Sequence, residues 1–301
     1  MNAPKSSHTG TLRSDVWLVL VTLLAAFGWV FSKEALAGMT PLLFLGARFL
    51  GAGVVLALLG WPALYRLTGE QWRRALMTGV VMGAAMSCWI MGLNLAENIG
   101  IGAFLTSLGV VFIPIVGKLL FGAVTARSTW VAVGVALVGL ALLRIEGGFT
   151  LSASDGFFLL AALVFSLHFN LTSRYAARIP ALPLTAVQLA MTGFFALLLS
   201  GLFETGQSMP ELDILGWLLA SLLIATCLRF WLQFKAQGLA PVSHAAVIMT
   251  LEPVWTSLLG LLWFSQTLSA VQLLGCGLIF SALLISRWRV LLRRPLPPVV
   301  S

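Results

Sequence analysis

Residues 96–115, AENIGIGAFLTSLGVVFIPI, and residues 236–254, AQGLAPVSHAAVIMTLEPV, follow the same plan. Each begins with a short polar link, continues as a run rich in small residues, and ends with a proline inside an apolar stretch. The two segments are about 140 residues apart, which predicts that the chain contains two related units. A similar offset relates two further pairs, Gly134 with Gly275 and Arg48 with Gln188.

The composition places both units in a membrane. Of the 301 residues, 59% are hydrophobic and 9% are charged, against about 45 to 50% and about 25% in soluble domains. About 20 apolar residues span a bilayer, and the chain contains ten apolar runs of roughly this length. They lie at 16–37, 41–60, 75–96, 101–122, 128–145, 156–176, 183–203, 214–236, 241–263 and 269–288.

Each unit therefore has five spans, and an odd number of spans turns the second unit upside down relative to the first. We expect an all-α polytopic membrane protein with ten transmembrane helices in a 5+5 inverted repeat. Many secondary transporters are built this way, with the substrate at the midplane where the halves meet. A duplicated bundle without a transport role is the alternative. The expected segments are an N-terminal tail at 1–15, repeats at 16–145 and 156–288, an outer linker at 146–155 and a basic tail at 289–301.

The distribution of basic residues predicts the orientation. With the N-terminus inside, most of the 18 Lys and Arg residues fall on the inner side, and only Lys33 and Arg144 fall outside. The positive-inside rule then places both termini in the cytoplasm of a bacterial inner-membrane protein. The net charge of +8 reflects this topology. No nucleic-acid partner is expected, because no basic stripe is interleaved with exposed aromatic residues.

Several short motifs resemble those of a known family. LEPV at 251–254, followed by an apolar run and LLG at 273–275, resembles the second-repeat signature of EamA-type carriers in the drug/metabolite transporter superfamily. GWVFSK at 28–33 and ARF at 47–49 are similar to the matching features of the first repeat. One departure is Ser-Gln at 265–266, where members of the family often carry Gly-Glu. The resemblance implies a secondary transporter, and the overall pattern is most similar to YddG-type exporters of aromatic and other amino acids.

Three ionisable residues inside the apolar runs are candidate functional groups. An ionised side chain at the bilayer centre costs roughly 2.5 to 3.5 kcal/mol on insertion scales, so it is expected to face a partner or water. Glu252 is either a carboxylate that meets a substrate ammonium or a coupling proton, or a structural partner of Arg229. Arg48 is a further gating or structural candidate. Pro114 and Pro253 are each expected to kink a helix beside the transport path.

Deep aromatic and polar side chains are candidates for the wall of a substrate cavity, which needs an apolar lining and a few polar groups. Static packing is the alternative for each aromatic residue. His168 is either a hydrogen-bonded interior histidine or a proton relay, and its native titration range suits both. The candidate substrate-binding residues are Trp29, Ser87, Trp89, Asn94, Phe104, Phe165, His168, Asn170, Trp231, His244 and Met249.

The predicted function is export of amino acids with aromatic or other apolar side chains, such as Phe, Trp and Met. A multidrug or cationic-compound exporter and a metabolite uptake carrier are the alternatives within transport. An intramembrane enzyme is not expected, because the chain has no G-x-S-x-G or H-E-x-x-H motif, and a channel would need a continuous polar lining. No cofactor or metal is expected: Cys88, Cys227 and Cys276 are widely spaced, and there is no nucleotide-binding loop. Direction, coupling ion and oligomeric state are left open.

Overall fold

The computed structural model describes residues 8–122, 127–144, 151–176, 179–205, 210–237 and 248–286, whose regular structure is helical. His244 and the predicted tail at 289–301 lie outside these ranges. In chain order the helices are α1 (His8–Ala35), α2 (Pro41–Leu59), α3 (Trp61–Leu64), α4 (Gly69–Leu95), α5 (Ile99–Ser107), α6 (Gly109–Phe121), α7 (Arg127–Arg144), α8 (Ala153–Ala176), α9 (Ala181–Phe203), α10 (Leu212–Leu222), the π-helix η1 (Leu223–Leu228), α11 (Arg229–Gln237), α13 (Glu252–Phe264) and α14 (Ala270–Ser286).

Many of these helices have the length and composition of membrane spans, which confirms the prediction of a helical polytopic membrane protein. The predicted runs at 128–145 and 269–288 contain the shorter apolar helices Trp130–Leu142 and Ala270–Ile285. Part of the predicted run at 241–263 lies outside the described residues. Within the described part of the chain, seven candidate spans are found, at Val16–Ala35, Pro41–Leu59, Gly69–Leu95, Ile99–Phe121, Ala153–Thr172, Ala181–Phe203 and Leu212–Gln233.

Local side chains explain where several helices begin. Thr68 and Gln71 form a capping box at the start of α4: the Gln71 N–H donates to the Thr68 hydroxyl at 3.3 Å, and the Thr68 N–H donates to the Gln71 side chain at 2.9 Å. Boxes of the same kind precede α8 and α14. Each box satisfies backbone donors that a helix start leaves free, so these starts are encoded in the local sequence.

Two of the apolar runs are interrupted near their prolines. The run at 101–122 divides at Leu108 into α5 and α6, and Pro114 lies inside α6. Pro253 is in the first turn of α13, where the missing N–H has no helical partner to lose. Residues 248 and 249 are also helical, and the run is interrupted at Thr250 and Leu251, directly ahead of Pro253, so the predicted kink beside the transport path stays a prediction.

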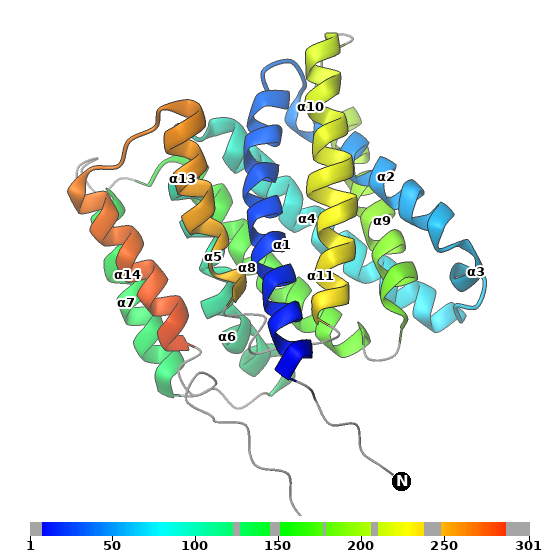
Figure 1. Ribbon diagram of the computed structural model, residues 1–301, viewed down its shortest axis with the longest axis horizontal. Coiled ribbons are helices and arrows are strands. Elements are labelled where there is room, and N and C mark those ends of the chain that lie inside the picture. The colour runs from blue at the N-terminus through cyan, green and yellow to red at the C-terminus, as the bar shows by residue number, and fades with distance from the viewer. Residues whose placement is uncertain are drawn as a thin grey trace, which may run out of the picture.

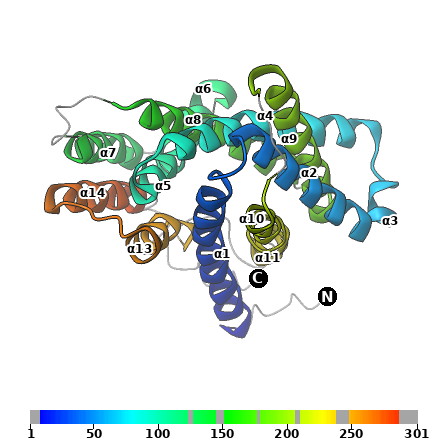
Figure 2. The same ribbon diagram turned by 90° about the horizontal axis from the view of Figure 1, so that it is seen from above.

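Helix α1 occupies a central position in the bundle. It packs against α10 and α11 on one side and against α13 on the other, as Figures 1 and 2 show. The pair α7 and α14 lies at one edge of the bundle, and α2 with α9 lies toward the opposite edge. The start of α1 and the end of α14 lie toward the same end of the bundle in Figure 1.

Two helix pairs approach closely because glycine leaves room for a facing backbone. A Cβ on Gly53 of α2 would overlap the backbone nitrogen of Ala190 in α9, and a Cβ on Gly193 of α9 would overlap that of Leu50 in α2. Helices α7 and α14 also pack closely, at Gly139, where a Cβ would lie 3.0 Å from the backbone nitrogen of Ile279.

Candidate functional site

The structure brings together a carboxylate, a guanidinium and an indole from three helices. Trp29 of α1 donates from Nε1 to Oε1 of Glu252, in the first turn of α13, at 3.1 Å. Arg229, the first residue of α11, places Nη2 3.6 Å from Oε2 of Glu252. The two charged side chains retain 20% and 24% exposure. The predicted pairing of Glu252 with Arg229 is therefore present, and the pair is accessible and loose.

Polar atoms near this pair lack hydrogen-bond partners. Nε of Arg229, Oε1 of Gln233 and Nε1 of Trp255 are buried and without a partner in the structure. Gln233 follows Arg229 by one turn of α11, and Trp255 follows Glu252 by one turn of α13. A buried polar atom without a partner costs about 1 to 3 kcal/mol, and such atoms call for an explanation, a ligand among them.

A second cation lies deeper in the same part of the bundle. Arg48 of α2 is 4% exposed; its Nε donates to Oγ1 of Thr226 at 2.7 Å and its Nη1 to Oγ of Ser32 at 2.9 Å. Thr226 lies in η1 and donates to the carbonyl of Ser221 at 3.0 Å. Short π-helical segments such as η1 occur often at functional sites. Among the described residues no carboxylate pairs with Arg48, so neutral groups hold its charge.

Aromatic rings cover one side of Trp29. Its ring centroid lies 4.8 Å from that of Trp89, in an edge-on arrangement, and 5.6 Å from that of Phe158. Phe104 belongs to the same buried apolar cluster, and Phe165 packs against it. Of the predicted aromatic residues, Trp89 therefore packs directly on Trp29, whose indole reaches Glu252, while Phe104 and Phe165 belong to the wider core of the bundle.

His168 and Asn170 lie in a separate polar group on α8. Nε2 of His168 lies 3.2 Å from Oε1 of Gln188 and 3.1 Å from Oγ1 of Thr172. Asn170 donates to the carbonyl of Ile113 in α6 at 3.0 Å, next to Pro114. These contacts fit a hydrogen-bonded interior histidine, whereas the relay stays a prediction.

The remaining predicted residues that the structure describes differ in burial. Ser87 is buried on α4, and its hydroxyl has no partner in the structure. Asn94 is exposed near the end of α4, and Trp231 is 46% exposed on α11. Met249 packs against α1. Of these four, only Ser87 has the burial expected of a cavity residue.

Gln233 and Trp255 were not predicted as site residues. Helical spacing offers the signal that finds them, because residues three or four positions apart share a helix face. Gln233 is four residues after Arg229, and Trp255 is three residues after Glu252. Taking the residue one helical turn after each charged residue would have predicted both Gln233 and Trp255.

At one end of the bundle, α13 and the residues that follow it contact the first half of the chain. Nε1 of Trp263 donates to Oε1 of Glu34 at 2.7 Å. Gln266 accepts from the Ile99 N–H at 3.1 Å and donates to the Glu97 carbonyl at 2.7 Å. A glutamate at position 266, as family members often carry, has no amide to donate, so the glutamine makes a contact that a carboxylate cannot make.

Replacing Ser265 by glycine is expected to stabilise the protein by about 0.5 to 1 kcal/mol. Ser265 ends α13 with φ 52° and ψ 29°, a left-handed conformation that glycine adopts without a Cβ penalty. Thermal unfolding in detergent measures the gain. Ser265→Ala is the control, because it keeps the Cβ and should gain nothing; an equal gain for alanine contradicts the backbone explanation.

Comparison with known proteins identifies the family. The sequence profile of the EamA-like transporter family matches residues 12–145 and 153–288. An uncharacterized transporter of Archaeoglobus fulgidus is 27% identical over 279 residues, which cover 93% of this chain and 87% of that protein. One crystal structure aligns with a TM-score of 0.64 at 18% identity, over 92% of this chain and 99% of the other, which shows a shared fold. The chain is a transporter and not an enzyme, and it belongs to the EamA-like transporter family of the drug/metabolite transporter superfamily.

Proposed function

We propose that this transporter exports amino acids with aromatic or other apolar side chains, such as Phe, Trp and Met, by alternating access. The observation that carries the proposal is the partly exposed pair of Arg229 and Glu252 beside Trp29. The ammonium of an amino acid suits Glu252, and its carboxylate suits Arg229. The loose pair and the unpartnered Nε of Arg229 leave both groups ready to exchange partners.

The balance of charge favours a substrate with a carboxylate over a cationic compound. Around the site the described residues supply two guanidinium groups, Arg48 and Arg229, against the one carboxylate of Glu252. An excess of positive charge in a low-dielectric interior repels a cation and attracts an anionic group. This balance supports the amino-acid assignment over the cationic-drug alternative.

The aromatic cluster supports an apolar side chain on the substrate. Trp29 connects the cluster to the carboxylate, because its ring packs on Trp89 and Phe158 while its Nε1 binds Glu252. Aromatic rings supply apolar area in a few rigid orientations. We place the substrate side chain against the face of this cluster nearest Glu252.

We further propose that the chain consists of two inverted five-helix repeats, at 16–145 and 156–288. Reciprocal contacts support this. Gly53 meets Ala190, and Gly193 meets Leu50; Gly193 and Ala190 each lie 140 residues after Gly53 and Leu50 respectively. A two-fold axis exchanges two such contacts with each other.

Packing elsewhere in the bundle follows the same relation. Gly139 meets Ile279, which lies 140 residues later, as a residue on the axis would. At the level of helices, α1 packs on α11 and α13 in the way that α8 packs on α4 and α6. These correspondences support a substrate site between the two repeats, where inverted-repeat transporters bind their substrates.

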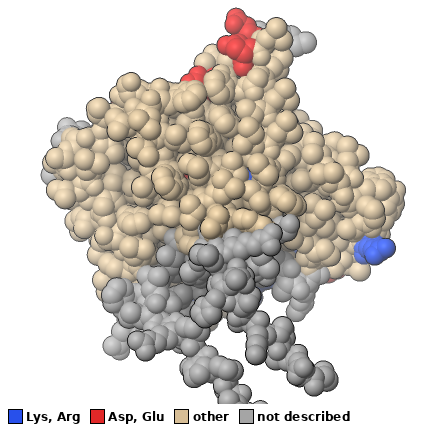
Figure 3. All heavy atoms as spheres, viewed as in Figure 1, with Lys and Arg blue, Asp and Glu red and all other residues tan. Residues whose placement is uncertain are grey.

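Both termini are proposed to lie in the cytoplasm, and the protein in the bacterial inner membrane. Exposed acidic residues, Glu211 and Asp213, lie at the start of α10, where Figure 3 shows acidic atoms gathered at one end. Arg66 and Arg73 are exposed near the start of α4, and a basic group lies lower in Figure 3. This separation is what the positive-inside rule describes.

In this proposal the structure is closed toward the outside. The contacts of Trp263 with Glu34 and of Gln266 with Ile99 join the two repeats at the end of the bundle where α1 ends. Alternating access requires these contacts to break when the substrate site opens outward.

Counterflow into liposomes loaded with unlabelled phenylalanine tests the substrate assignment. Labelled phenylalanine should accumulate, and excess unlabelled Trp and Met should compete. Phenethylamine lacks the carboxylate and 3-phenylpropionate lacks the ammonium, so neither should compete well. Competition by phenethylamine or tetraphenylphosphonium alone would favour the cationic-compound exporter, and competition by phenylpropionate alone would favour a carrier of organic anions.

A further inference from the structure

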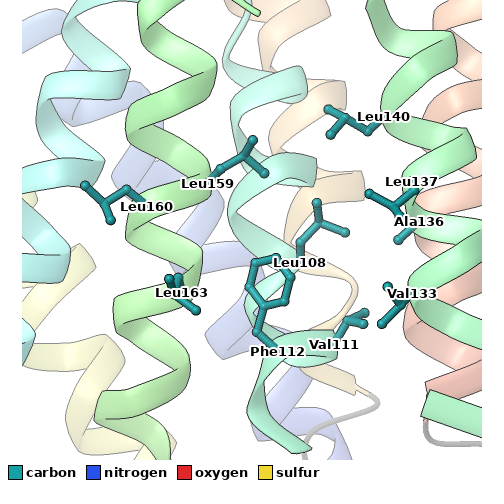
Figure 4. A pocket seen from close by; sticks show the side chains of 10 residues that line it. All are labelled: Leu108, Val111, Phe112, Val133, Ala136, Leu137, Leu140, Leu159, Leu160 and Leu163. Atoms are coloured by element: carbon teal, nitrogen blue, oxygen red, sulfur yellow. The ribbon is translucent and has the colours of Figure 1, made fainter. Parts of the chain in front are cut away.

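An apolar groove opens along α6, α7 and α8. It encloses about 420 Å³ between the end of α5, α6, α7 and α8. Figure 4 shows side chains of α7 across an open space from those of α5 and α6. Leu137, Leu160 and Leu163 are 60%, 46% and 47% exposed, so the groove is open along its side. The lining residues are Leu108, Val111, Phe112, Val133, Ala136, Leu137, Leu140, Leu159, Leu160 and Leu163.

The helices around the groove are held by other partners. Helix α7 packs mainly along α14, and α8 packs mainly along α4. The side chains of α7 and α8 that line the groove therefore do not fill the space between the two helices. Because the groove faces the hydrocarbon of the bilayer and its lining side chains are all apolar, it suits an acyl chain and rejects a polar solute.

Two cations lie in the last turns of α6 and α8. Lys118 of α6 lies with Nζ 5.9 Å from the ring centroid of Trp130 in α7, and Arg174 of α8 lies with Cζ 4.0 Å from that of Phe121 in α6. Among the residues that the structure describes, no carboxylate forms an ion pair with either cation. Basic groups between transmembrane helices at a membrane face are a recognised site for anionic lipid headgroups.

The spacing along α6 connects the cations to the groove. Lys118 follows the groove residue Val111 by seven positions, which is about two turns and about 10 Å along a helix, so the two residues share one face of α6. A headgroup at Lys118 therefore directs its acyl chain into the groove. We propose that an anionic phospholipid binds here, with its phosphate at Lys118 and Arg174 and one acyl chain between α6, α7 and α8.

Delipidated protein in detergent tests the proposal through thermal unfolding and native mass spectrometry. Dioleoyl phosphatidylglycerol and dioleoyl phosphatidylcholine are compared, because they share acyl chains and differ in headgroup charge. Phosphatidylglycerol should raise the unfolding midpoint at a lower lipid concentration than phosphatidylcholine does. In native mass spectrometry it should remain bound as an adduct of one lipid per protein. Equal responses to the two lipids would overturn the proposal.

Four variants separate the headgroup from the groove. Lys118→Gln combined with Arg174→Gln should raise the phosphatidylglycerol concentration for half-maximal stabilisation about tenfold or more. The control Arg66→Gln removes an exposed cation elsewhere and should change little. Leu137→Trp fills the groove and should abolish the adduct, whereas Leu119→Trp, at a 76% exposed position of α6 that does not line the groove, should retain it.

Persistence of the phosphatidylglycerol preference in the double basic variant would overturn the headgroup assignment. Persistence of the adduct in Leu137→Trp would overturn the groove as its site. If Lys118→Gln with Arg174→Gln folds poorly, Lys118→Gln alone gives the same comparison with one cation retained. These readouts use no transport assay, so they stand or fall apart from the proposed substrate.

Discussion

Replacing Glu252 by glutamine is expected to abolish counterflow of phenylalanine in a protein that still folds and inserts. The glutamine oxygen can still accept the Trp29 N–H, which bonds Glu252 at 3.1 Å, so the local packing is kept. The negative charge that the proposed substrate ammonium requires is lost. Truncating one partner of a buried charge pair costs about 2 to 5 kcal/mol in binding; because this site is partly exposed, the lower end applies, and the initial rate at low substrate should fall about 30-fold.

The double variant Glu252→Gln with Arg229→Gln separates a structural pair from a substrate site. It removes both charges and so leaves no unpaired guanidinium at the position of Arg229. If the pair only holds α11 to α13, the double variant recovers counterflow that the single variant loses. If the pair binds substrate, both variants stay inactive. Normal counterflow in the single variant would remove Glu252 from substrate binding.

A coupling proton on Glu252 gives a third pattern. Counterflow exchanges substrate for substrate without net proton movement, whereas accumulation driven by a pH gradient requires it. Counterflow retained in Glu252→Gln with loss of pH-driven accumulation would assign the carboxylate to a proton. The same liposomes, with and without a pH gradient, measure both activities.

The membrane class and the charged pair were both predictable from the sequence, because charged residues are rare inside apolar runs. Glu252 and Arg229 stand out in runs that otherwise contain few ionisable groups, and an interior charge needs a partner or water. The structure places Arg229 and Glu252 3.6 Å apart. The strength of the signal comes from the cost of burying charge in lipid.

The direction in which each helix faces was much less predictable. In a soluble protein, the polar face of a helix is exposed, so the opposite face can be identified as the buried one. A membrane helix is apolar on both faces and gives no such signal. Trp29 and Trp231 both lie deep in apolar runs; the structure buries Trp29 against Glu252 and leaves Trp231 46% exposed. Asn94 is likewise exposed. Hydropathy cannot separate such residues.

Some backbone irregularities escaped prediction. Proline marks either the beginning of a helix or a bend, and the interruption at Thr250 and Leu251 lies directly ahead of Pro253. The break at Leu108 and the π-helix η1 carry no local signal of this kind. In η1, Thr226 accepts a hydrogen bond from Arg48 of the distant helix α2, a contact that the local sequence does not reveal.

Replacing Gly193 by alanine is expected to destabilise the protein by about 3 kcal/mol, at the upper end of overpacking effects. The new Cβ would overlap the backbone nitrogen of Leu50, which cannot move aside as a flexible side chain can. The strain would separate α2 from α9. Unfolding in SDS, followed by far-ultraviolet circular dichroism, measures the loss.

The proposed two-fold relation makes a second glycine the decisive comparison. Gly53 contacts Ala190 as Gly193 contacts Leu50, so Gly53→Ala should cost about as much as Gly193→Ala if the two contacts are related by symmetry. Gly201, also in α9, has open space where a Cβ would lie, with nothing within 4 Å of that position, and its replacement by alanine should gain up to about 1 kcal/mol from helix propensity. A large cost at one of the paired glycines and none at the other would contradict the symmetric crossing, because both Cβ atoms would overlap a backbone nitrogen of the facing helix.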